Sequence, residues 1–346
     1  MISKKPIRIL VVDDSGLVRD LISSILASEQ DMTIIGEATN GMDAFEKVMA
    51  LKPDIVTMDI EMPVLGGLEA IEKIMAEHPV PILVITALTG VRTAFAAVSK
   101  GALDVIEKPD ISIDNVRKLI TKVRMLSRVD INAHLANMGK KPTVPEQKIS
   151  LPESSHKSAS GRLVAIASST GGPQAIYKIL SALLKTFPVP IVITQHIAKG
   201  FTQGMVDWLS GGTALAVKVA AHGDHLKPGQ VYINPAEHSM TISGHSIVIG
   251  PQDEKNIFHP SCNTMLNSAA QAYRGRAIGL ILSGMGNDGV EGLRAIKAAG
   301  GVTLAQDAKS SVVFGMNKVA VDKGYVDLVL PLAEIAGGLM NLVSRK

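Results

Sequence analysis

The sequence predicts an α/β protein with two domains: an N-terminal doubly wound domain and a C-terminal domain built on a mainly parallel sheet. Short, continuously apolar runs alternate with segments of helical periodicity, which is the pattern of parallel strands covered by helices on both faces. A polar stretch rich in proline and serine, from about residue 139 to 161, interrupts this pattern, which resumes at Arg162. We therefore predict domains at residues 1–127 and 162–346, joined by a linker at 128–161.

Composition excludes several classes of protein. The 346 residues are 46% hydrophobic, enough for each of two domains to bury its own core. A net charge of +3 and 3% aromatic residues do not favour nucleic-acid binding. Cys262 is the only cysteine, so an intrachain disulfide is excluded and a reducing compartment is indicated. No apolar run approaches the ~18 residues of a membrane span. We therefore expect a cytoplasmic protein without direct membrane insertion.

In the first domain, the predicted strands end in polar side chains. The apolar runs end at Asp13 and Asp14, at Asp59, at Thr86 and at Lys108. In a parallel sheet the ligand site lies beyond the carboxyl ends of the strands, so these five side chains should share one edge. The helices expected between and after these strands are Leu17–Ser28, Met42–Leu51, Leu68–Glu77, Arg92–Lys100 and Asn115–Leu126.

This set of residues is sufficient for phosphoryl transfer to a carboxylate. Asp13 and Asp14 can hold Mg²⁺, which prefers a few carboxylates together with phosphate oxygens. Asp59 can attack phosphorus as a nucleophile, and Lys108 can neutralise the phosphate as a point charge. One aspartate after a strand is more often a turn or helix-capping residue. Five suitable residues at matching strand ends favour the functional interpretation.

Residues 5–125 resemble the receiver domain of bacterial two-component response regulators. The motifs that carry this resemblance are Val11-Val12-Asp13-Asp14-Ser15, Met58-Asp59-Ile60-Glu61-Met62-Pro63, Thr86-Ala87 and Lys108-Pro109. The resemblance implies a flavodoxin-like fold with Asp59 as phospho-acceptor. It also implies that Asp14, Asp59 and the main-chain carbonyl of Glu61 hold Mg²⁺, and that Thr86 and Lys108 act as switch residues.

The second domain repeats the alternation of strands and helices. Pro173 stands where a proline is favoured at the start of a helix. The expected elements are a strand at Leu163–Ala167, a helix at Ala175–Leu184, a strand at Val189–Thr194, a hairpin-like stretch at Val231–Ile249, a strand at Ala277–Leu282 and a helix at Val290–Ala299.

Three residues at expected strand ends of this domain could form a hydrolytic triad. Ser169 lies where a strand passes into a helix, His196 ends the next strand and Asp288 follows another. A serine needs a base to take its proton, and a carboxylate can orient the imidazole. The residues alone leave an alternative open, because a Ser-Thr-Gly-Gly turn before a helix could equally cradle a phosphate. The remaining histidines show no convincing metal spacing.

Residues 162–345 resemble the catalytic domain of the chemotaxis protein-glutamate methylesterases, the CheB family. The motifs that carry this resemblance are Ala167-Ser168-Ser169-Thr170-Gly171-Gly172, Thr194-Gln195-His196, Ser283-Gly284-Met285-Gly286-Asn287-Asp288-Gly289 and Val313-Phe314-Gly315-Met316. The resemblance implies Ser169 as nucleophile, His196 as general base and acid, Asp288 as its orienting carboxylate and the Met285 N–H as an oxyanion donor. The chain departs from the family pattern at Ala167-Ser168, Ala198, Asn263 and Asn317.

Together the two resemblances imply a phosphorylation-activated enzyme. It would hydrolyse glutamate γ-methyl esters on methyl-accepting chemoreceptors, giving glutamate and methanol, and would also deamidate receptor glutamines. A chemotaxis histidine kinase would be the phosphodonor; phosphorylation would need Mg²⁺, and the esterase reaction no cofactor. The rival interpretation is a phosphorelay binding module with an inactive hydrolase-like domain. A DNA-binding response regulator is disfavoured, because its effector domain would be mainly helical and more basic.

Overall fold

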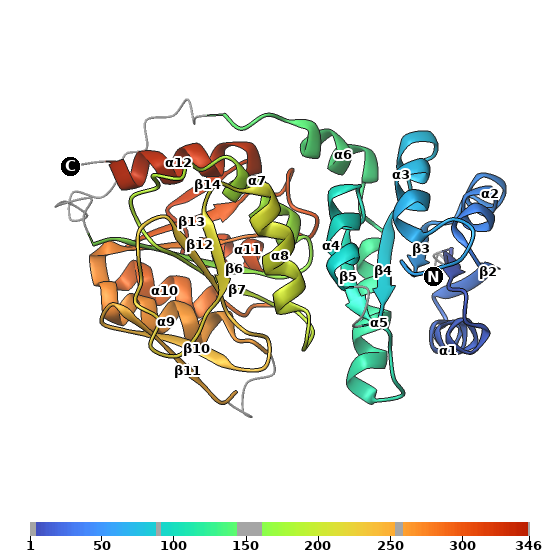
Figure 1. Cartoon of the computed structure of the whole chain (residues 1–346), viewed down its shortest axis with the longest axis horizontal. Coiled ribbons are helices and arrows are strands. Elements are labelled where there is room, and N and C mark those ends of the chain that lie inside the picture. Colours follow the sequence, from blue (N-terminus) through green and yellow to red (C-terminus); the bar gives the residue numbers. More distant parts are fainter. Residues whose placement is uncertain (1–4, 88–90, 144–160, 253–258, 345–346) are drawn as a thin grey trace. The chain divides into compact units, whose positions relative to one another are not determined.

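The computed structural model describes residues 5–87, 91–143, 161–252 and 259–344. The chain divides into two compact units, with the border between Leu135 and Ala136 (Figure 1). Each unit has its own sheet, so the prediction of two α/β domains is confirmed.

The first unit is a doubly wound parallel sheet. Its strand order is β2-β1-β3-β4-β5, and every adjacent pair is parallel. Helices α1 and α5 contact each other on one face, whereas α2 and α4 both contact α3 on the other. The elements are β1 (Ile7–Val12), α1 (Gly16–Ala27), β2 (Met32–Ala38), α2 (Gly41–Leu51), β3 (Ile55–Met58), α3 (Gly67–Glu77), β4 (Ile82–Thr86), α4 (Val91–Ser99), β5 (Asp104–Glu107) and α5 (Ile113–Leu126).

The five predicted helices of this unit are confirmed to within two residues at each end. Strand β2 was not predicted, for a physical reason. It lies at the edge of the sheet, where it pairs with β1 alone, and most of its residues are only partly buried. An edge strand with one open side lacks the continuous apolar run that marks the central strands.

A further helix, α6 (Ile131–Gly139), forms inside the predicted linker. Ile131 and His134 are buried on it. Leu135 lies so close to Gly101 that a Cβ at position 101 would be 3.1 Å from Leu135 Cδ2. The first turn of α6 therefore packs against the first unit. Residues 144–160 of the predicted linker lie outside the described residues, and its exact borders stay a prediction.

The second unit is built on a seven-stranded parallel sheet with the order β14-β13-β12-β6-β7-β9-β8. Its elements are β6 (Leu163–Ser168), α7 (Gly172–Ser181), β7 (Ile191–Gln195), α8 (Thr202–Gly212), β8 (Ala216–Val219), β9 (Gln230–Ile233), β10 (Ser239–Ser243), β11 (Ser246–Gly250), α9 (Cys262–Tyr273), the short 3₁₀ helix η3 (Arg274–Arg276), β12 (Ala277–Ile281), α10 (Val290–Ala298), β13 (Val302–Gln306), α11 (Met316–Asp322), β14 (Leu328–Leu330) and α12 (Leu332–Ser344).

Strand β6 is the point from which the chain extends the second sheet in both directions. β7 pairs with one side of β6, and β12 pairs with the other. Helices α9, α10 and α11 share one hydrophobic core beneath β6, while α7 and α12 contact each other in the opposite layer (Figure 1). In open α/β sheets such a reversal of strand order leaves a crevice at the carboxyl ends of the strands. The ends of β7, β6 and β12 are therefore the expected place for a site.

The predicted hairpin-like stretch, Val231–Ile249, needs a correction. Its first part is β9, a parallel strand of the large sheet, and the antiparallel hairpin consists only of β10 and β11. Gly244, with φ of 57°, lies in the turn between them. Alternation of apolar residues indicates a half-buried strand, but it does not show which strand lies beside it. The sequence pattern therefore did not separate the parallel strand β9 from the antiparallel strands β10 and β11.

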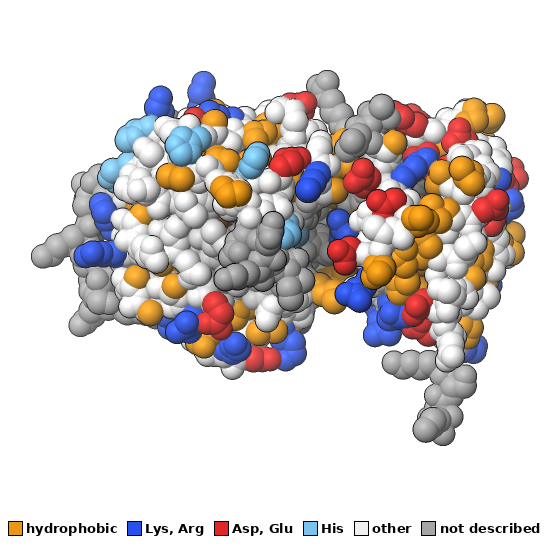
Figure 2. All heavy atoms as spheres, turned by 90° about the horizontal axis from the view of Figure 1, so that it is seen from below, with side chains coloured by type: hydrophobic (Ala, Val, Ile, Leu, Met, Phe, Trp, Pro, Cys, Tyr) orange, Lys and Arg blue, Asp and Glu red, His pale blue; other side chains and the backbone are white. Residues whose placement is uncertain are grey.

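None of the described helices combines the length and the apolar character that a membrane span requires. On the face shown in Figure 2, basic and acidic side chains are interspersed on both units. This face therefore shows no region of a single sign of charge like that expected of a nucleic-acid footprint.

The buried His134 makes the stability of the first unit pH-dependent. Burial lowers the pKa of His134 from its ordinary 6.5 to about 4, and no described residue is a hydrogen-bond partner of its Nε2. Between pH 6.5 and about pH 4, His134 is protonated in the unfolded chain and neutral in the folded chain. We expect the free energy of unfolding to fall by about 2 kcal/mol between pH 8 and pH 5 through this residue. Urea unfolding of His134→Leu should show a correspondingly shallower pH dependence, and an unchanged one would refute this role.

Candidate functional site

The carboxyl edge of the first sheet gathers the predicted acidic residues. Carboxylate oxygens of Asp13, Asp14 and Asp59 lie within 4.8 Å of one another. The Lys108 Nζ lies 2.8 Å from Asp13 Oδ2 and 2.8 Å from Asp59 Oδ2. Three carboxylates thus face one ammonium group, and the excess negative charge suits a divalent cation. Hard oxygen ligands of this kind fit Mg²⁺.

Burial decides the electrostatics of this cluster. Asp59 is 3% exposed, and burial, reinforced by the charge of Asp13, raises the pKa of Asp59 although Lys108 opposes the shift. Burial alone would lower the pKa of Lys108, but its hydrogen bonds to Asp13 and Asp59 outweigh that effect and raise it. The lysine therefore stays charged. Asp59 is more basic than an ordinary aspartate, which favours its reaction with an electrophile.

The Thr86 hydroxyl is placed where it could donate a hydrogen bond to an anion. Thr86 ends β4 and is fully buried, and among the described residues its Oγ1 has no hydrogen-bond partner. Its carbonyl accepts a hydrogen bond of 3.0 Å from the Lys108 N–H, which ties the two predicted switch residues together. A buried hydroxyl without a partner is costly, so an incoming phosphate oxygen would stabilise it. Glu61 lies two residues beyond Asp59 and is exposed, and its carbonyl as a metal ligand stays a prediction.

In the second unit, Ser169 lies on a tight turn between β6 and α7. Its N–H donates to the Ser283 carbonyl at 3.0 Å, and its carbonyl accepts from the Gly172 N–H at 2.7 Å. Gly171, with φ of 76°, occupies the left-handed region that glycine tolerates. A Cβ at Gly284 would lie 2.6 Å from the Ser169 Cβ. Glycine at these positions therefore lets neighbouring backbone approach the serine closely.

The neighbouring Ser168 has a structural role. It is fully buried, and its Oγ donates to Gln195 Oε1 at 2.6 Å. The Gln195 Nε2 in turn donates to the carbonyls of Ser169 and His196, at 2.9 Å each. A Cβ at Gly172 would lie 2.1 Å from Gln195 Oε1, so glycine there keeps room for the amide. The Gln195 side chain thus links the turn of the serine to the strand end of the histidine.

Strand register places Ser169 and His196 side by side. Ala167 pairs with Thr194 and Ser168 with Gln195, so Ser169 and His196 follow as the next pair beyond the strand ends. The His196 N–H continues the ladder by donating to the Ser168 carbonyl at 3.0 Å. The sheet itself therefore brings the predicted nucleophile and base together.

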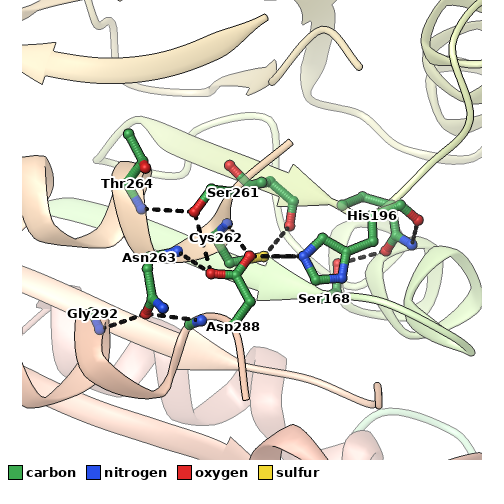
Figure 3. A network of polar contacts seen from close by, with 11 residues as sticks. Ser168, His196, Ser261, Cys262, Asn263, Thr264, Asp288 and Gly292 are labelled. Carbon is green, nitrogen blue, oxygen red and sulfur yellow. Dashed lines mark hydrogen bonds and ion pairs between the residues drawn. The ribbon is translucent and has the colours of Figure 1, made fainter. Parts of the chain in front are cut away.

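Asp288 approaches the histidine from the loop after β12 (Figure 3). The His196 Nε2 and Asp288 Oδ2 are 2.8 Å apart. This contact uses Nε2, so Nδ1 is the ring nitrogen that can act on the serine. If Nε2 carries the ring proton and donates it to the Asp288 carboxylate, Nδ1 is unprotonated and can accept a proton.

The N-terminus of α9 holds the Asp288 carboxylate. Asp288 accepts hydrogen bonds from the N–H groups of Cys262 at 2.6 Å and Asn263 at 2.9 Å, and from the Ser261 hydroxyl at 3.2 Å (Figure 3). Burial alone would raise the pKa of Asp288, but the contacts with His196, Asn263 and Cys262 outweigh it and lower the pKa. The helix N-terminus favours the negative charge as well. Asp288 is therefore ionised and fixed in orientation.

The Met285 N–H is one of the main-chain donors of the glycine-rich loop that have no acceptor among the described residues. The Ser283 N–H is taken by Gln306 Oε1 and the Gly284 N–H by the Val313 carbonyl, at 3.0 Å each. No described residue accepts a hydrogen bond from the Met285 N–H, and Met285 is 46% exposed. This main-chain group therefore remains available to a ligand.

Two departures from the family pattern act as structural supports. The Asn263 Oδ1 accepts from the N–H groups of Gly289 and Gly292, at 2.9 Å each, and so caps the start of α10 (Figure 3). An aspartate here would add a second negative charge beside Asp288. Asn317 is fully buried, and its Nδ2 donates to the Gln306 carbonyl at 3.0 Å. Nothing in the described part of the chain explains Ala198.

Residue-type reasoning missed the supporting roles of Gln195, Ser168 and Asn263. The sequence shows that Gln195 precedes His196, but it does not show which carbonyls the Gln195 amide binds. A polar residue at the buried end of a parallel strand is the one signal that could have pointed to it.

Comparison with known proteins covers nearly the whole chain. The model of the response regulator receiver domain matches residues 9–121, and that of the CheB methylesterase matches residues 164–339. A protein-glutamate methylesterase/protein-glutamine glutaminase 3 of Paramagnetospirillum magneticum is 42% identical, over 99% of this chain and 98% of that protein. The Thermotoga maritima protein-glutamate methylesterase/protein-glutamine glutaminase is 38% identical, over 97% and 98% respectively.

One solved structure matches the second unit. The crystal structure of the Thermotoga maritima CheB methylesterase catalytic domain has 38% sequence identity and a TM-score of 0.51, and the match covers 53% of this chain and 99% of that one. The receiver model matches the N-terminal part of the chain and the methylesterase model the C-terminal part, and the relatives match along nearly their full length. The chain therefore belongs to the CheB methylesterases that carry a response regulator receiver domain.

Proposed function

We propose that this chain hydrolyses γ-methyl esters of glutamate on methyl-accepting chemoreceptors, and that phosphorylation of Asp59 raises the rate. The observation that carries the proposal is the 2.8 Å contact between His196 Nε2 and Asp288 Oδ2, at the sheet edge where Ser169 follows the adjacent strand. The relatives that match this chain along nearly their full length are named for the same substrate class, which supports the proposal.

The arrangement suits acyl transfer in two steps. The Nδ1 of His196 takes the proton of Ser169 as its Oγ attacks the ester carbonyl, and Asp288 stabilises the imidazolium that forms. The Met285 N–H donates to the developing oxyanion. The imidazolium then returns the proton to the leaving methoxide, and methanol departs from the acyl-enzyme.

Water completes the cycle on the same residues. His196 takes a proton from water, the hydroxide attacks the acyl carbon, and the proton passes to the Ser169 oxygen as glutamate leaves. An amide substrate follows the same route with ammonia as leaving group. Deamidation of receptor glutamines is therefore part of the proposal, and the double name of the relatives supports it.

The first unit would control this reaction through phosphorylation. Asp59 attacks the phosphorus of a phosphodonor, which we propose to be a chemotaxis histidine kinase. Mg²⁺, when bound by Asp13, Asp14, Asp59 and the Glu61 carbonyl, would neutralise charge on the phosphoryl oxygens. The phosphate adds about two negative charges. Lys108 and the Thr86 hydroxyl would then bind it, which changes the packing at the ends of β4 and β5.

The alternative, a binding module with an inactive hydrolase-like domain, finds no support among the relatives, whose names state the enzyme activity. The three proposed reacting groups are all present in the second unit. We propose the cytoplasm as the site of action, because the cytoplasmic helices of chemoreceptors would carry the substrate.

Methanol release tests the whole proposal. Methylated receptor should release methanol with the full chain, and a small-molecule phosphodonor with Mg²⁺ should increase the rate several-fold. Asp59→Asn should keep the basal rate and lose the increase, because it removes only the acceptor. An equal increase in Asp59→Asn would place the phosphorylation elsewhere, and no methanol release under any condition would contradict the esterase assignment.

The two adjacent serines should differ sharply. Ser169→Ala should lower kcat on the order of 10⁴-fold, since the nucleophile is gone. Ser168→Ala should leave most activity, because it only deprives Gln195 Oε1 of one donor, at about 1–3 kcal/mol of stability. Steady-state kinetics on the same ester and thermal unfolding measure both effects. The reverse pattern of activities would make Ser168 the nucleophile.

Gln195 should behave as a positioning residue. Gln195→Leu removes the link between the Ser169 and His196 carbonyls, and we expect kcat to fall about 10²-fold with little change in KM. Gln203→Leu is the matched control, because Gln203 is exposed on α8 and its amide bonds only Asp207. A folded Gln195→Leu enzyme with the wild-type kcat would show that the strand ends hold the geometry without this amide.

A further inference from the structure

Two residues of the proposed active site, His196 and Asp288, meet a third side chain of a metal-binding type, that of Cys262. The His196 Nε2, the Cys262 Sγ and a carboxylate oxygen of Asp288 all lie within 4.8 Å of one another. They come from the end of β7, the first residue of α9 and the loop before α10 (Figure 3). The thiol takes no part in the proposed reaction, to which Cys262 contributes its main-chain N–H as a donor to Asp288.

The distances within this group approach those of a tetrahedral metal site. The Cys262 Sγ lies 3.6 Å from the His196 Nε2. With metal–nitrogen and metal–sulfur bonds of ~2.05 and ~2.3 Å, a tetrahedral ion places these two atoms about 3.6 Å apart. The Nε2–Oδ2 distance is 2.8 Å, and it would have to widen by roughly 0.5 Å when the ion replaces the shared proton. The Sγ and Nε2 are therefore already placed for a common ion.

Charge and softness define the class of ion. One thiolate and one carboxylate neutralise a divalent cation, so the buried complex would carry no net charge. Sulfur and imidazole ligands favour Zn²⁺ and its chemical relatives over Mg²⁺, which prefers oxygen. The acidic cluster of the first unit has only oxygen donors among its three carboxylates. The two units thus present donor sets for two different classes of cation.

We propose that His196, Cys262 and Asp288 form an inhibitory site for Zn²⁺ and similar borderline divalent cations. The ion binds as the thiol releases its proton to water and the ring proton of His196 moves from Nε2 to Nδ1, so that the ion takes the place of the hydrogen bond between Nε2 and Oδ2. The ion would approach from the side of His196, because the His196 side chain is 14% exposed whereas Cys262 is fully buried. With the ion on Nε2 and the ring proton on Nδ1, His196 cannot take the proton of Ser169. This inhibition rests on the proposed roles of Ser169 and His196, but ion binding does not.

Cobalt provides a direct test, because Cys262 is the only cysteine of the chain. Co²⁺ is added to the full-length protein with excess Mg²⁺, which fills the oxygen site. A thiolate-to-cobalt absorption band in the near ultraviolet should appear, and stoichiometric Zn²⁺ should abolish it. The band should be lost in Cys262→Ala and should need at least tenfold more Co²⁺ in His196→Ala. Asp59→Asn, which alters the other site, should leave the band unchanged.

Activity and metal binding are then compared on one preparation. Zn²⁺ should inhibit hydrolysis of a small ester by the wild-type enzyme, and the concentration for half inhibition should rise at least tenfold in Cys262→Ala relative to the variant's own metal-free rate. X-ray absorption of the wild-type zinc complex should show one sulfur neighbour at ~2.3 Å, a result that depends on no variant. Absence of the cobalt band, or a band that is the same in His196→Ala, overturns the site. A band without any esterase activity would instead contradict the proposed function alone.

Discussion

The buried Asp288 carboxylate is the constraint on which the second unit depends. An ionised carboxylate away from water is unfavourable unless charge and hydrogen bonds compensate for it. Here the first N–H groups of α9, the Ser261 hydroxyl and His196 all converge on it. The start of α9 and the end of β7 are therefore fixed relative to β12. The contacts that stabilise the charge of Asp288 therefore also fix the position of His196.

The Gln195 amide extends this arrangement to the nucleophile. Its single side chain contacts the carbonyls of Ser169 and His196 and is oriented by the Ser168 hydroxyl. All of these groups are buried or nearly so, which makes each hydrogen bond expensive to leave unmade. A buried polar network that is fully paired favours one geometry over its alternatives. This explains how a turn and two strand ends can hold Ser169 and His196 in one arrangement.

The two units use buried carboxylates in opposite ways. Around Asp288, hydrogen bonds outweigh burial and lower the pKa, so the charge is stable and can orient a base. Around Asp59, burial and the charge of Asp13 prevail over Lys108 and raise the pKa. A fully satisfied carboxylate serves as a fixed support. Asp59 accepts hydrogen bonds from Ile60 and Lys108, but its raised pKa makes it more basic, and a nearby cation would stabilise its charge.

The sequence by itself determined the two α/β domains and the residues at their strand ends, because buried parallel strands are apolar runs and polar side chains at their carboxyl ends share one edge. It could not decide how β9 pairs, that α6 folds within the linker, or which serine donates to Gln195, since these depend on neighbours distant in the chain. The Gln195 link, the Asn263 cap on α10 and the meeting of Cys262 with His196 exist only once β6, β7, β12 and α9 are assembled. A hydrogen bond depends on distances of tenths of an ångström, and only tertiary packing sets those distances.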